Sequence, residues 1–175
     1  MKVYVIRHGQ TELNKLGIIN GHIDDPLASE GIEQAKLAAE TLPKTIKHIY
    51  VSSLERAKQT ASILNDELKV PMTFHDELRE VNFGDLNGTP FLDEYKERHK
   101  MLDYDWRPSG ESFDDVKARV LKILNVVKNE NGDGEALIVA HGGTIRLMHF
   151  LETGEYLDNV GNASIQSFDL DKILK

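Results

Sequence analysis

Residues 136–144 read Ala-Leu-Ile-Val-Ala-His-Gly-Gly-Thr, and this stretch decides the fold. No polar side chain interrupts the apolar run 136–140, a pattern typical of a strand buried on both faces in a parallel or mixed sheet. Gly142 and Gly143 then predict the start of a helix that extends to about Leu151. Backbone N–H groups at such a helix start can seat an anion. Taken alone, the two glycines fit equally well a helix start that only needs backbone freedom.

Strand and helix patterns alternate on both sides of this stretch. Val3–Ile6 is apolar and predicts a first strand, and a helical period runs from Ser112 to Val127. The other predicted elements are a helix opened by Ser29 as N-cap and closed by Pro43, a strand at His48–Val51, a helix from about Leu54 to Leu68 capped by Ser52-Ser53, a strand at Pro71–Phe74 and a final strand at Ser164–Leu170. This order predicts an α/β fold, a three-layer α/β/α sandwich around a mostly parallel sheet.

The composition of the 175 residues is that of an ordinary soluble globular chain, and the length predicts a single domain spanning 1–175. A net charge of -8 argues against a general binder of nucleic acid or of anionic membranes. The absence of cysteine excludes disulfides, thiolate metal sites and thiol nucleophiles. Because Met1-Lys2 leads directly into the first strand and no apolar run is long enough for a membrane span, we expect a cytoplasmic protein. No feature predicts an oligomeric state.

Residues 84–110 differ in kind from the rest of the chain. Glycine and proline punctuate both ends of this segment, and a charged helical pattern occupies Asp93–Lys100. That composition predicts a short lid over a site rather than core structure. Five nearby side chains are expected either to line the lid side of a pocket or to pack the lid against the body: Phe83, Tyr95, Tyr104, Trp106 and Arg107.

Chemically active side chains follow the predicted strand ends, which lie at one edge of a parallel sheet. Arg7 and His8 end the first strand, Arg56 lies in the first turn of the helix after the second strand, and His141 ends the central strand. Each has an ordinary explanation when taken alone: a solvated strand end, a helix arginine paired with a neighbour, a packed histidine. Glu80 is one of several carboxylates after the third strand.

Taken together, these residues indicate a phosphoryl site. Arg7 is a permanent planar cation that suits forked contact with phosphate, and His8 has a nitrogen that is partly neutral at pH 7. Gly9 is expected to let a backbone amide approach an anion closely. We interpret this combination as a histidine nucleophile held against a phosphoryl group.

Six segments, in order, resemble motifs of the histidine phosphatase superfamily, which includes the phosphoglycerate mutases and related broad phosphatases. The resemblance runs from Val3 to the final strand. The segments are Arg7-His8-Gly9-Gln10-Thr11-Glu12-Leu13-Asn14, Asn20-Gly21-His22-Ile23-Asp24-Asp25-Pro26-Leu27, Ser52-Ser53-Leu54-Glu55-Arg56-Ala57-Lys58-Gln59-Thr60-Ala61, Leu78-Arg79-Glu80 with Gly84, Gly110-Glu111-Ser112, and Ala140-His141-Gly142-Gly143. One such match is weak evidence, whereas six in the same order are specific.

The resemblance implies a phosphoglycerate mutase-like fold and a metal-independent phosphatase that acts through phosphohistidine. His8 would attack phosphorus, and Glu80, with a pKa raised beside the phosphate dianion, would protonate the leaving alkoxide. The implied catalytic residues are His8, Glu80, Arg7, Arg56 and His141, and the implied substrate contacts are Arg7, Asn14, Asn20, Gly21, Arg56, Glu80, His141 and Gly142. No cofactor is expected, and His141 with His149 lacks the His-Glu-x-x-His arrangement of a zinc site.

Three departures from the family pattern bear on substrate choice. The sequence has Gly84-Asp85-Leu86-Asn87-Gly88 where many relatives have Gly-x-Trp-Glu-Gly, it has Leu13 where tryptophan is frequent, and its lid is short. The expected partner is a small phosphate ester of open identity, with no nucleic acid or membrane. Two alternatives are a mutase, which returns the phosphoryl group to its substrate, and a non-catalytic phosphate-binding module. The short lid favours hydrolysis, and the presence of both a nucleophile and an acid argues against a module.

Overall fold

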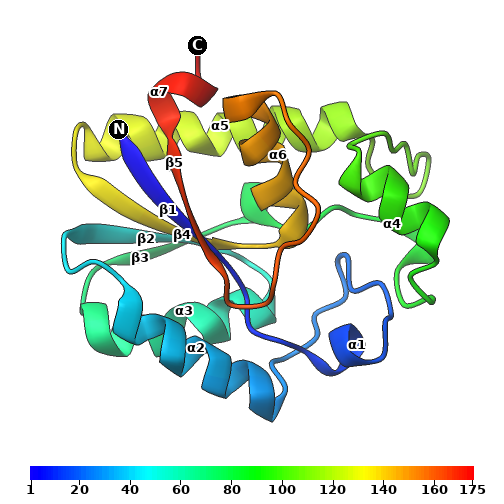
Figure 1. The fold of residues 1–175 in the computed structure, drawn as a ribbon, viewed down its shortest axis with the longest axis horizontal. Helices are drawn as coiled ribbons and strands as arrows, with labels where there is room; N and C mark the ends of the chain where they lie inside the picture. The colour runs from blue at the N-terminus through cyan, green and yellow to red at the C-terminus, as the bar shows by residue number, and fades with distance from the viewer.

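The computed structural model describes all residues, 1–175, and places a five-stranded sheet between two layers of helices (Figure 1). The strand order is β3-β2-β4-β1-β5, with β5 antiparallel to β1 and the other neighbours parallel. The strands are β1 Lys2–Arg7, β2 Ile46–Ser52, β3 Met72–His75, β4 Glu135–Ala140 and β5 Ile165–Asp169. The apolar run 136–140 is the centre of the sheet, and the predicted α/β sandwich is confirmed.

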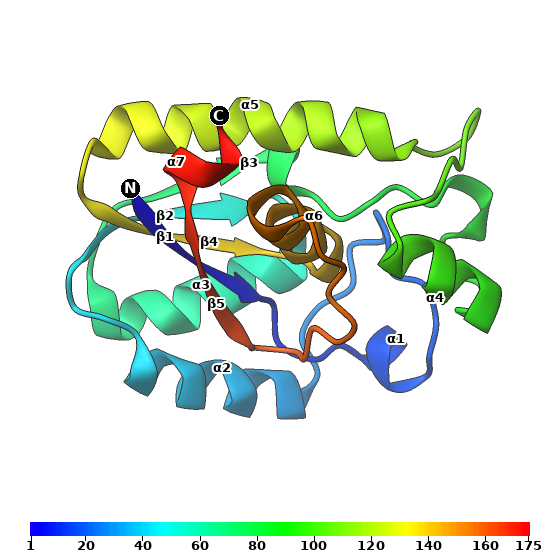
Figure 2. The same cartoon turned by 45° about the horizontal axis from the view of Figure 1, so that its top comes forward.

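Helices cover both faces of the sheet. Figures 1 and 2 show α2 and α3 on one face and α5, α6 and α7 on the other, while α1 and α4 stand beyond one end of the strands. The helices are α1 Glu12–Lys15, α2 Ser29–Thr41, α3 Glu55–Leu68, α4 Asp93–Lys100, α5 Phe113–Asn131, α6 Gly142–Thr153 and α7 Leu170–Ile173, with 3₁₀ turns η1 Asp76–Leu78 and η2 Gly84–Leu86. None of these helices is both long and apolar enough to cross a membrane.

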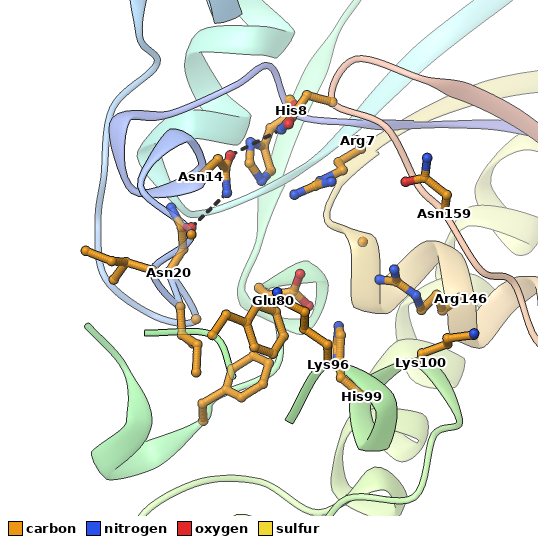
Figure 3. A pocket seen from close by; sticks show the side chains of 18 of the residues that line it. Arg7, His8, Asn14, Asn20, Glu80, Lys96, His99, Lys100, Arg146 and Asn159 are labelled. Atoms are coloured by element: carbon orange, nitrogen blue, oxygen red, sulfur yellow. Dashed lines mark hydrogen bonds between the residues drawn. The ribbon is translucent and has the colours of Figure 1, made fainter. Parts of the chain in front are cut away.

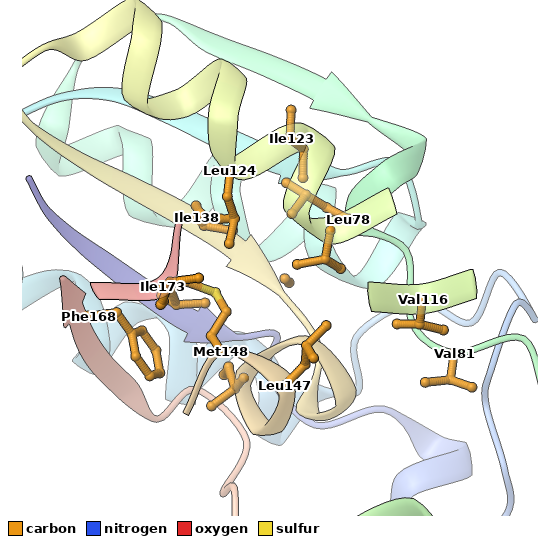
Figure 4. Packing of buried hydrophobic residues seen from close by; sticks show 14 of the residues in the cluster. Leu78, Val81, Val116, Ile123, Leu124, Ile138, Leu147, Met148, Phe168 and Ile173 are labelled. Carbon is orange, nitrogen blue, oxygen red and sulfur yellow. The ribbon is translucent and has the colours of Figure 1, made fainter. Parts of the chain in front are cut away.

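Two apolar clusters hold the layers together, and β4 contributes alternate residues to each. Ile138 packs in the larger cluster with residues of α5 and α6, which Figure 4 shows around it, whereas Leu137 and Val139 belong to the smaller cluster under α2 and α3. Successive side chains of a strand point to opposite faces, so a central strand covered on both sides needs an unbroken apolar run. Leu137, Ile138 and Val139 are fully buried, and the burial of each side chain contributes about 1.5–3 kcal/mol to stability.

The predicted N-caps of two helices were wrong, although the helices begin within one residue of the predicted positions. Ser29 is the first residue of α2, whose N-cap is Ala28 without a side-chain bond, and α3 has Leu54 as its N-cap rather than Ser52 or Ser53. The two serines are used elsewhere: the Ser52 hydroxyl lies 2.7 Å from His141 Nε2, and the Ser53 hydroxyl accepts a bond from Arg79 Nε. Tertiary partners therefore outcompete local capping at this helix start.

The segment 84–110 packs its aromatic side chains in two ways. Tyr104 and Trp106 are buried in the larger cluster and Tyr95 packs against it, so these three attach the segment to the body. Phe83, which precedes the segment, is buried in the same cluster and also lines the cavity described below, and Arg107 is exposed beside Asp105. The base of the segment is tied to residues 17–19, as shown by the bonds Ile19 N to Thr89 O (2.9 Å) and Phe91 N to Gly17 O (2.8 Å).

Gly9 has a packing role that differs from the predicted one. Its N–H donates to the Thr60 hydroxyl at 3.0 Å, and an added Cβ would lie 2.3 Å from Gly31 O at the start of α2. We expect Gly9→Ala to lower the free energy of unfolding by about 1–3 kcal/mol, because the backbone of Gly31 cannot move away from the added methyl group as easily as a flexible side chain would. Chemical denaturation measures this. Gly161→Ala, whose Cβ would make only an ordinary contact with Ser164 Cβ at 3.9 Å, is the control, and equal losses in both variants would contradict the prediction.

Candidate active site

The carboxyl ends of the parallel strands converge on a cavity of about 600 Å³ (Figure 3). β1 ends at Arg7, and His8 follows; the turn from β2 into α3 supplies Arg56, and the segment after β3 and η1 supplies Glu80. The lining includes eight of the nine predicted site residues: Arg7, His8, Asn14, Asn20, Gly21, Arg56, Glu80 and Gly142. The ninth, His141, is fully buried and is absent from the lining.

His8 is held as a neutral base with its outer nitrogen free of a proton. Its Nδ1 lies 2.7 Å from Gly9 O, and because a carbonyl only accepts, Nδ1 carries the proton and Nε2 keeps its lone pair. Arg56 Nε donates to that Nε2 at 3.2 Å. Burial, followed by the charges of Arg56 and Arg7, lowers the pKa of His8 well below its ordinary value of 6.5. The imidazole is therefore unprotonated at neutral pH and able to act as a nucleophile.

Arg56 is a fully buried cation and Arg7 is a partly buried one, and neither forms a salt bridge with a carboxylate. Arg56 is 0% exposed and donates to Ile23 O and Gly21 O, each at 2.8 Å, while Arg7 donates to Val160 O and leaves its buried Nε without a partner. Neither takes part in an ion pair, although the chain has 29 acidic residues. Burial lowers both pKa values, that of Arg56 to about 10. Because neither guanidinium forms an ion pair, the two cations favour an anionic ligand beside them.

Glu80 is held in its ionised form by backbone donors. Val81 N–H donates to Oε1 at 2.8 Å, and Gly143 N–H, in the first turn of α6, donates to Oε2 at 3.3 Å. Burial alone would raise the pKa of Glu80, but the N–H groups of Val81 and Gly143 and the charge of Arg56 act in the opposite direction, and that pKa lies below its ordinary value. The sequence analysis predicts a raised pKa for Glu80 beside a bound phosphate dianion. In the protein without a ligand, the surrounding groups lower the pKa of Glu80 instead.

His141 lies behind His8 rather than on the cavity wall. The two rings are tilted, with centroids 5.1 Å apart, and the Nδ1 atom of His141 is buried without a partner. Burial, followed by the charge of Arg56, lowers the pKa of His141 well below 6.5. The ring of His141 is accordingly neutral. Its Nδ1 atom is the one ring nitrogen without a hydrogen-bond partner.

The two predicted asparagines differ in what they can offer a ligand. Asn20 uses both N–H groups on Thr11 Oγ1 (2.9 Å) and Asp25 Oδ2 (3.0 Å), so it has no donor left for an anion. Asn14 uses one N–H on Asn20 Oδ1 at 2.8 Å and keeps the other. Its Oδ1 accepts from Asn162, which also donates to His8 O, each at 3.2 Å. Asn20 therefore orients Asn14, and Asn14 can reach a ligand.

Four residues of the site were missed by the sequence analysis: His99, Arg119, Arg146 and Asn162. Arg119 of α5 donates to Arg79 O (2.7 Å) and Glu80 O (3.0 Å) and pairs with Glu111 at 2.7 Å, which fixes the Glu80 segment from behind. A cation on the otherwise apolar face of a long helix was the only signal for it. His99, in the charged helix α4, gave none; it is 5% exposed, and burial lowers its pKa to about 4.

Comparison with known proteins agrees with this geometry. The family model described as histidine phosphatase superfamily (branch 1) matches residues 3–172. Glucosyl-3-phosphoglycerate phosphatase of Mycolicibacterium vanbaalenii is 34% identical, over 93% of this chain and 81% of its own. Adenosylcobalamin/alpha-ribazole phosphatase of Salmonella typhimurium is 32% identical, over 85% and 77%. The crystal structure of a phosphoglycerate mutase from Thermus thermophilus superposes with a TM-score of 0.79 at 29% identity, over 97% and 93%.

The matched residues include every strand and nearly all of the helical layers, and the cavity lies within them. The chain belongs to the histidine phosphatase superfamily.

Proposed function

We propose that the protein is a phosphatase that hydrolyses a small phosphate monoester through a phosphohistidine at His8. The observation that carries this proposal is the unprotonated Nε2 of His8 beside two guanidinium groups that form no salt bridge. Phosphoryl transfer needs chiefly positioning and neutralisation of the equatorial oxygens. Arg7 and Arg56 would supply the charge, and Asn14 and the start of α6 at Gly142 would supply neutral donors.

The reaction divides into two displacements. In the first, His8 Nε2 forms a bond to phosphorus, the ester P–O bond breaks, and Glu80 gives its proton to the leaving oxygen. In the second, Glu80 takes a proton from water, the water oxygen bonds to phosphorus, and the P–N bond to His8 breaks. Two easier steps replace one difficult one, which is the general advantage of covalent catalysis. We further propose that residues 84–110 act as a lid on a single domain.

Glu80 must acquire its proton when the substrate binds. Its pKa is held below the ordinary value by the surrounding protein groups, so the free enzyme has an ionised Glu80 at neutral pH. A phosphate monoester loses its second proton at about pH 6, so a monoanionic ester can bring the proton with it. Transfer of that proton to Glu80 leaves a dianionic ester between Arg7 and Arg56, with the acid in place.

The test is an assay of inorganic phosphate release from a panel of phosphate esters, with and without EDTA. We expect release that vanadate inhibits and EDTA leaves unchanged, because the scheme contains no metal. No group of three or more His, Asp or Glu side chains is placed to hold a metal ion. Loss of activity on chelation would contradict the proposed mechanism. With 3-phosphoglycerate as substrate, formation of the 2-isomer without phosphate would identify a mutase instead.

A further inference from the structure

Ser52 is a buried polar residue of the site that the mechanism above does not use. It is the last residue of β2, one position after Val51, which pairs with Val139 of the central strand. Ser52 therefore lies at the level where β4 ends and His141 follows. Ser52 is 0% exposed, and its hydroxyl lies 2.7 Å from His141 Nε2. A partner at one ring nitrogen of a histidine decides which of the two nitrogens has the proton.

The hydrogen bonds of Ser52 fix the direction of this contact. Its hydroxyl oxygen has two partners in the protein, His141 Nε2 and the Leu54 N–H, which donates to it at 3.4 Å. A backbone N–H only donates, so His141 Nε2 is the sole acceptor for the hydroxyl proton. With a proton on that nitrogen, both partners would be donors and the buried O–H of Ser52 would have no acceptor, which is strongly disfavoured. Ser52 therefore donates to His141 Nε2.

This direction decides where the proton of His141 lies. The imidazole is neutral, because burial, followed by the charge of Arg56, lowers its pKa well below 6.5. A neutral imidazole has one ring proton, and because Nε2 accepts from Ser52, that proton is on Nδ1. His141 is 0% exposed, and its Nδ1 has no partner in the protein. The site thus contains a buried N–H donor whose acceptor is not a protein group.

The position of His141 indicates which acceptor this is. Its ring lies 5.1 Å from that of His8, centroid to centroid, and Arg56 donates to His8 Nε2 at 3.2 Å. A phosphoryl group bonded to that Nε2 has its oxygens next to these side chains. An N–H on His141 Nδ1 attracts such an oxygen, whereas a lone pair on the same atom would repel it.

We propose that Ser52 is a positioning residue that holds His141 in the Nδ1–H tautomer, so that this N–H donates to an oxygen of the phosphoryl group at His8. The inference rests on the proposed function, because the acceptor is the group that His8 attacks. No proton moves in this contact: the N–H bond stays intact while the ester P–O bond breaks and charge develops on the oxygens. A donor that is oriented before the substrate binds needs no reorganisation during the reaction.

The tautomer of His141 in the wild-type protein is the direct test, and it needs no turnover. In protein whose seven histidines are labelled with ¹⁵N, long-range proton–nitrogen correlation spectra distinguish a protonated ring nitrogen from an unprotonated one. The signals of His141 are identified by their absence from His141→Asn. We expect Nδ1–H both in the free protein and with inorganic phosphate bound. A proton on Nε2 would overturn the proposal, whatever the protein hydrolyses.

Replacement of Ser52 tests the link between the two residues. Ser52→Ala removes the donor to Nε2, so the Nε2–H tautomer of His141 should become populated in the free protein, and Ser52→Thr, which keeps the hydroxyl, should restore Nδ1–H. If Ser52→Ala does not fold, Ser52→Cys, whose thiol is a weak donor, takes its place. Ser53→Ala is the matched control, because the neighbouring hydroxyl bonds Arg79 and Asp76. An unchanged tautomer without the Ser52 hydroxyl, with or without a loss of thermal stability, would contradict the role of Ser52.

Binding of vanadate and inorganic phosphate links the tautomer to the phosphoryl site. Vanadate bonded to His8 imitates the five-coordinate transition state, in which the donor matters most. Isothermal titration should show that Ser52→Ala binds vanadate about tenfold more weakly than the wild type and phosphate only about threefold more weakly, and kcat should fall more than KM changes. Wild-type affinity for vanadate in a variant with the altered tautomer would show that His141 does not contact the phosphoryl group. If no ester is hydrolysed, the proposed function fails, while the spectra and the vanadate titration still decide the role of Ser52.

Discussion

A His8→Ala variant should lose at least about 10⁴-fold of the wild-type kcat for any phosphate ester that the protein hydrolyses. The Nε2 atom of His8 is an unprotonated nitrogen beside Arg7 and Arg56, and alanine offers no atom to bond to phosphorus. His141 does not replace it, because it is fully buried and absent from the cavity wall. The loss should therefore appear in kcat more than in KM, since both arginines remain to bind the phosphoryl group.

Covalent labelling separates this loss from a folding defect. Wild-type protein that is quenched during turnover of a phosphate-labelled ester should yield acid-labile label on His8, and His8→Ala should yield none. Circular dichroism and thermal unfolding establish that the variant is folded. His149→Ala, which removes an imidazole outside the cavity, should retain both label and rate. Turnover by His8→Ala at the wild-type rate would refute the covalent mechanism.

The strands and the order of the motifs could be predicted because both are local in sequence. The run 136–140 is apolar at every position, which only a strand covered on both faces requires, and it does form the centre of the sheet. The convergence of Arg7, Arg56 and Glu80 followed from a parallel sheet, whose strand ends share one edge. These predictions depended on short segments and one topological rule, so they did not need side-chain detail.

The contacts that set the charge state of the site could not be predicted. Nothing near Ser52 in the sequence shows that its hydroxyl contacts His141 instead of capping α3, because that choice depends on a residue 89 positions away. Likewise, the charged pattern of α4 predicted a lid helix rather than core structure and gave no sign of His99, which is buried against the cavity. The ionised state of Glu80 depends on Arg56 and on Gly143 N–H, which only the tertiary fold brings together.

A Glu80→Gln variant should reveal whether the leaving group needs a proton. Alkoxides are strong bases, so hydrolysis of an alkyl phosphate should slow by about 10²-fold to 10⁴-fold without the acid. p-Nitrophenolate leaves without protonation, so hydrolysis of p-nitrophenyl phosphate should slow by less than about tenfold. Steady-state kinetics on the two esters measures the contrast. Glu77→Gln, a carboxylate outside the cavity that pairs with Lys122, is the control. Equal losses on both esters would show that Glu80 only supports the structure of the site.

The pH dependence of the wild type gives the same residue a second test. The pKa values of His8 and Glu80 lie below their ordinary values of 6.5 and 4.5, so above pH 6.5 the free enzyme has a neutral His8 and an ionised Glu80. The productive complex needs one further proton, which the ester supplies only below its second pKa of about 6. We therefore expect kcat/KM to be level below about pH 6 and to fall by about tenfold per unit above it. In Glu80→Gln this alkaline fall should flatten, because glutamine needs no proton from the ester, and an unchanged profile would show that the required proton resides elsewhere.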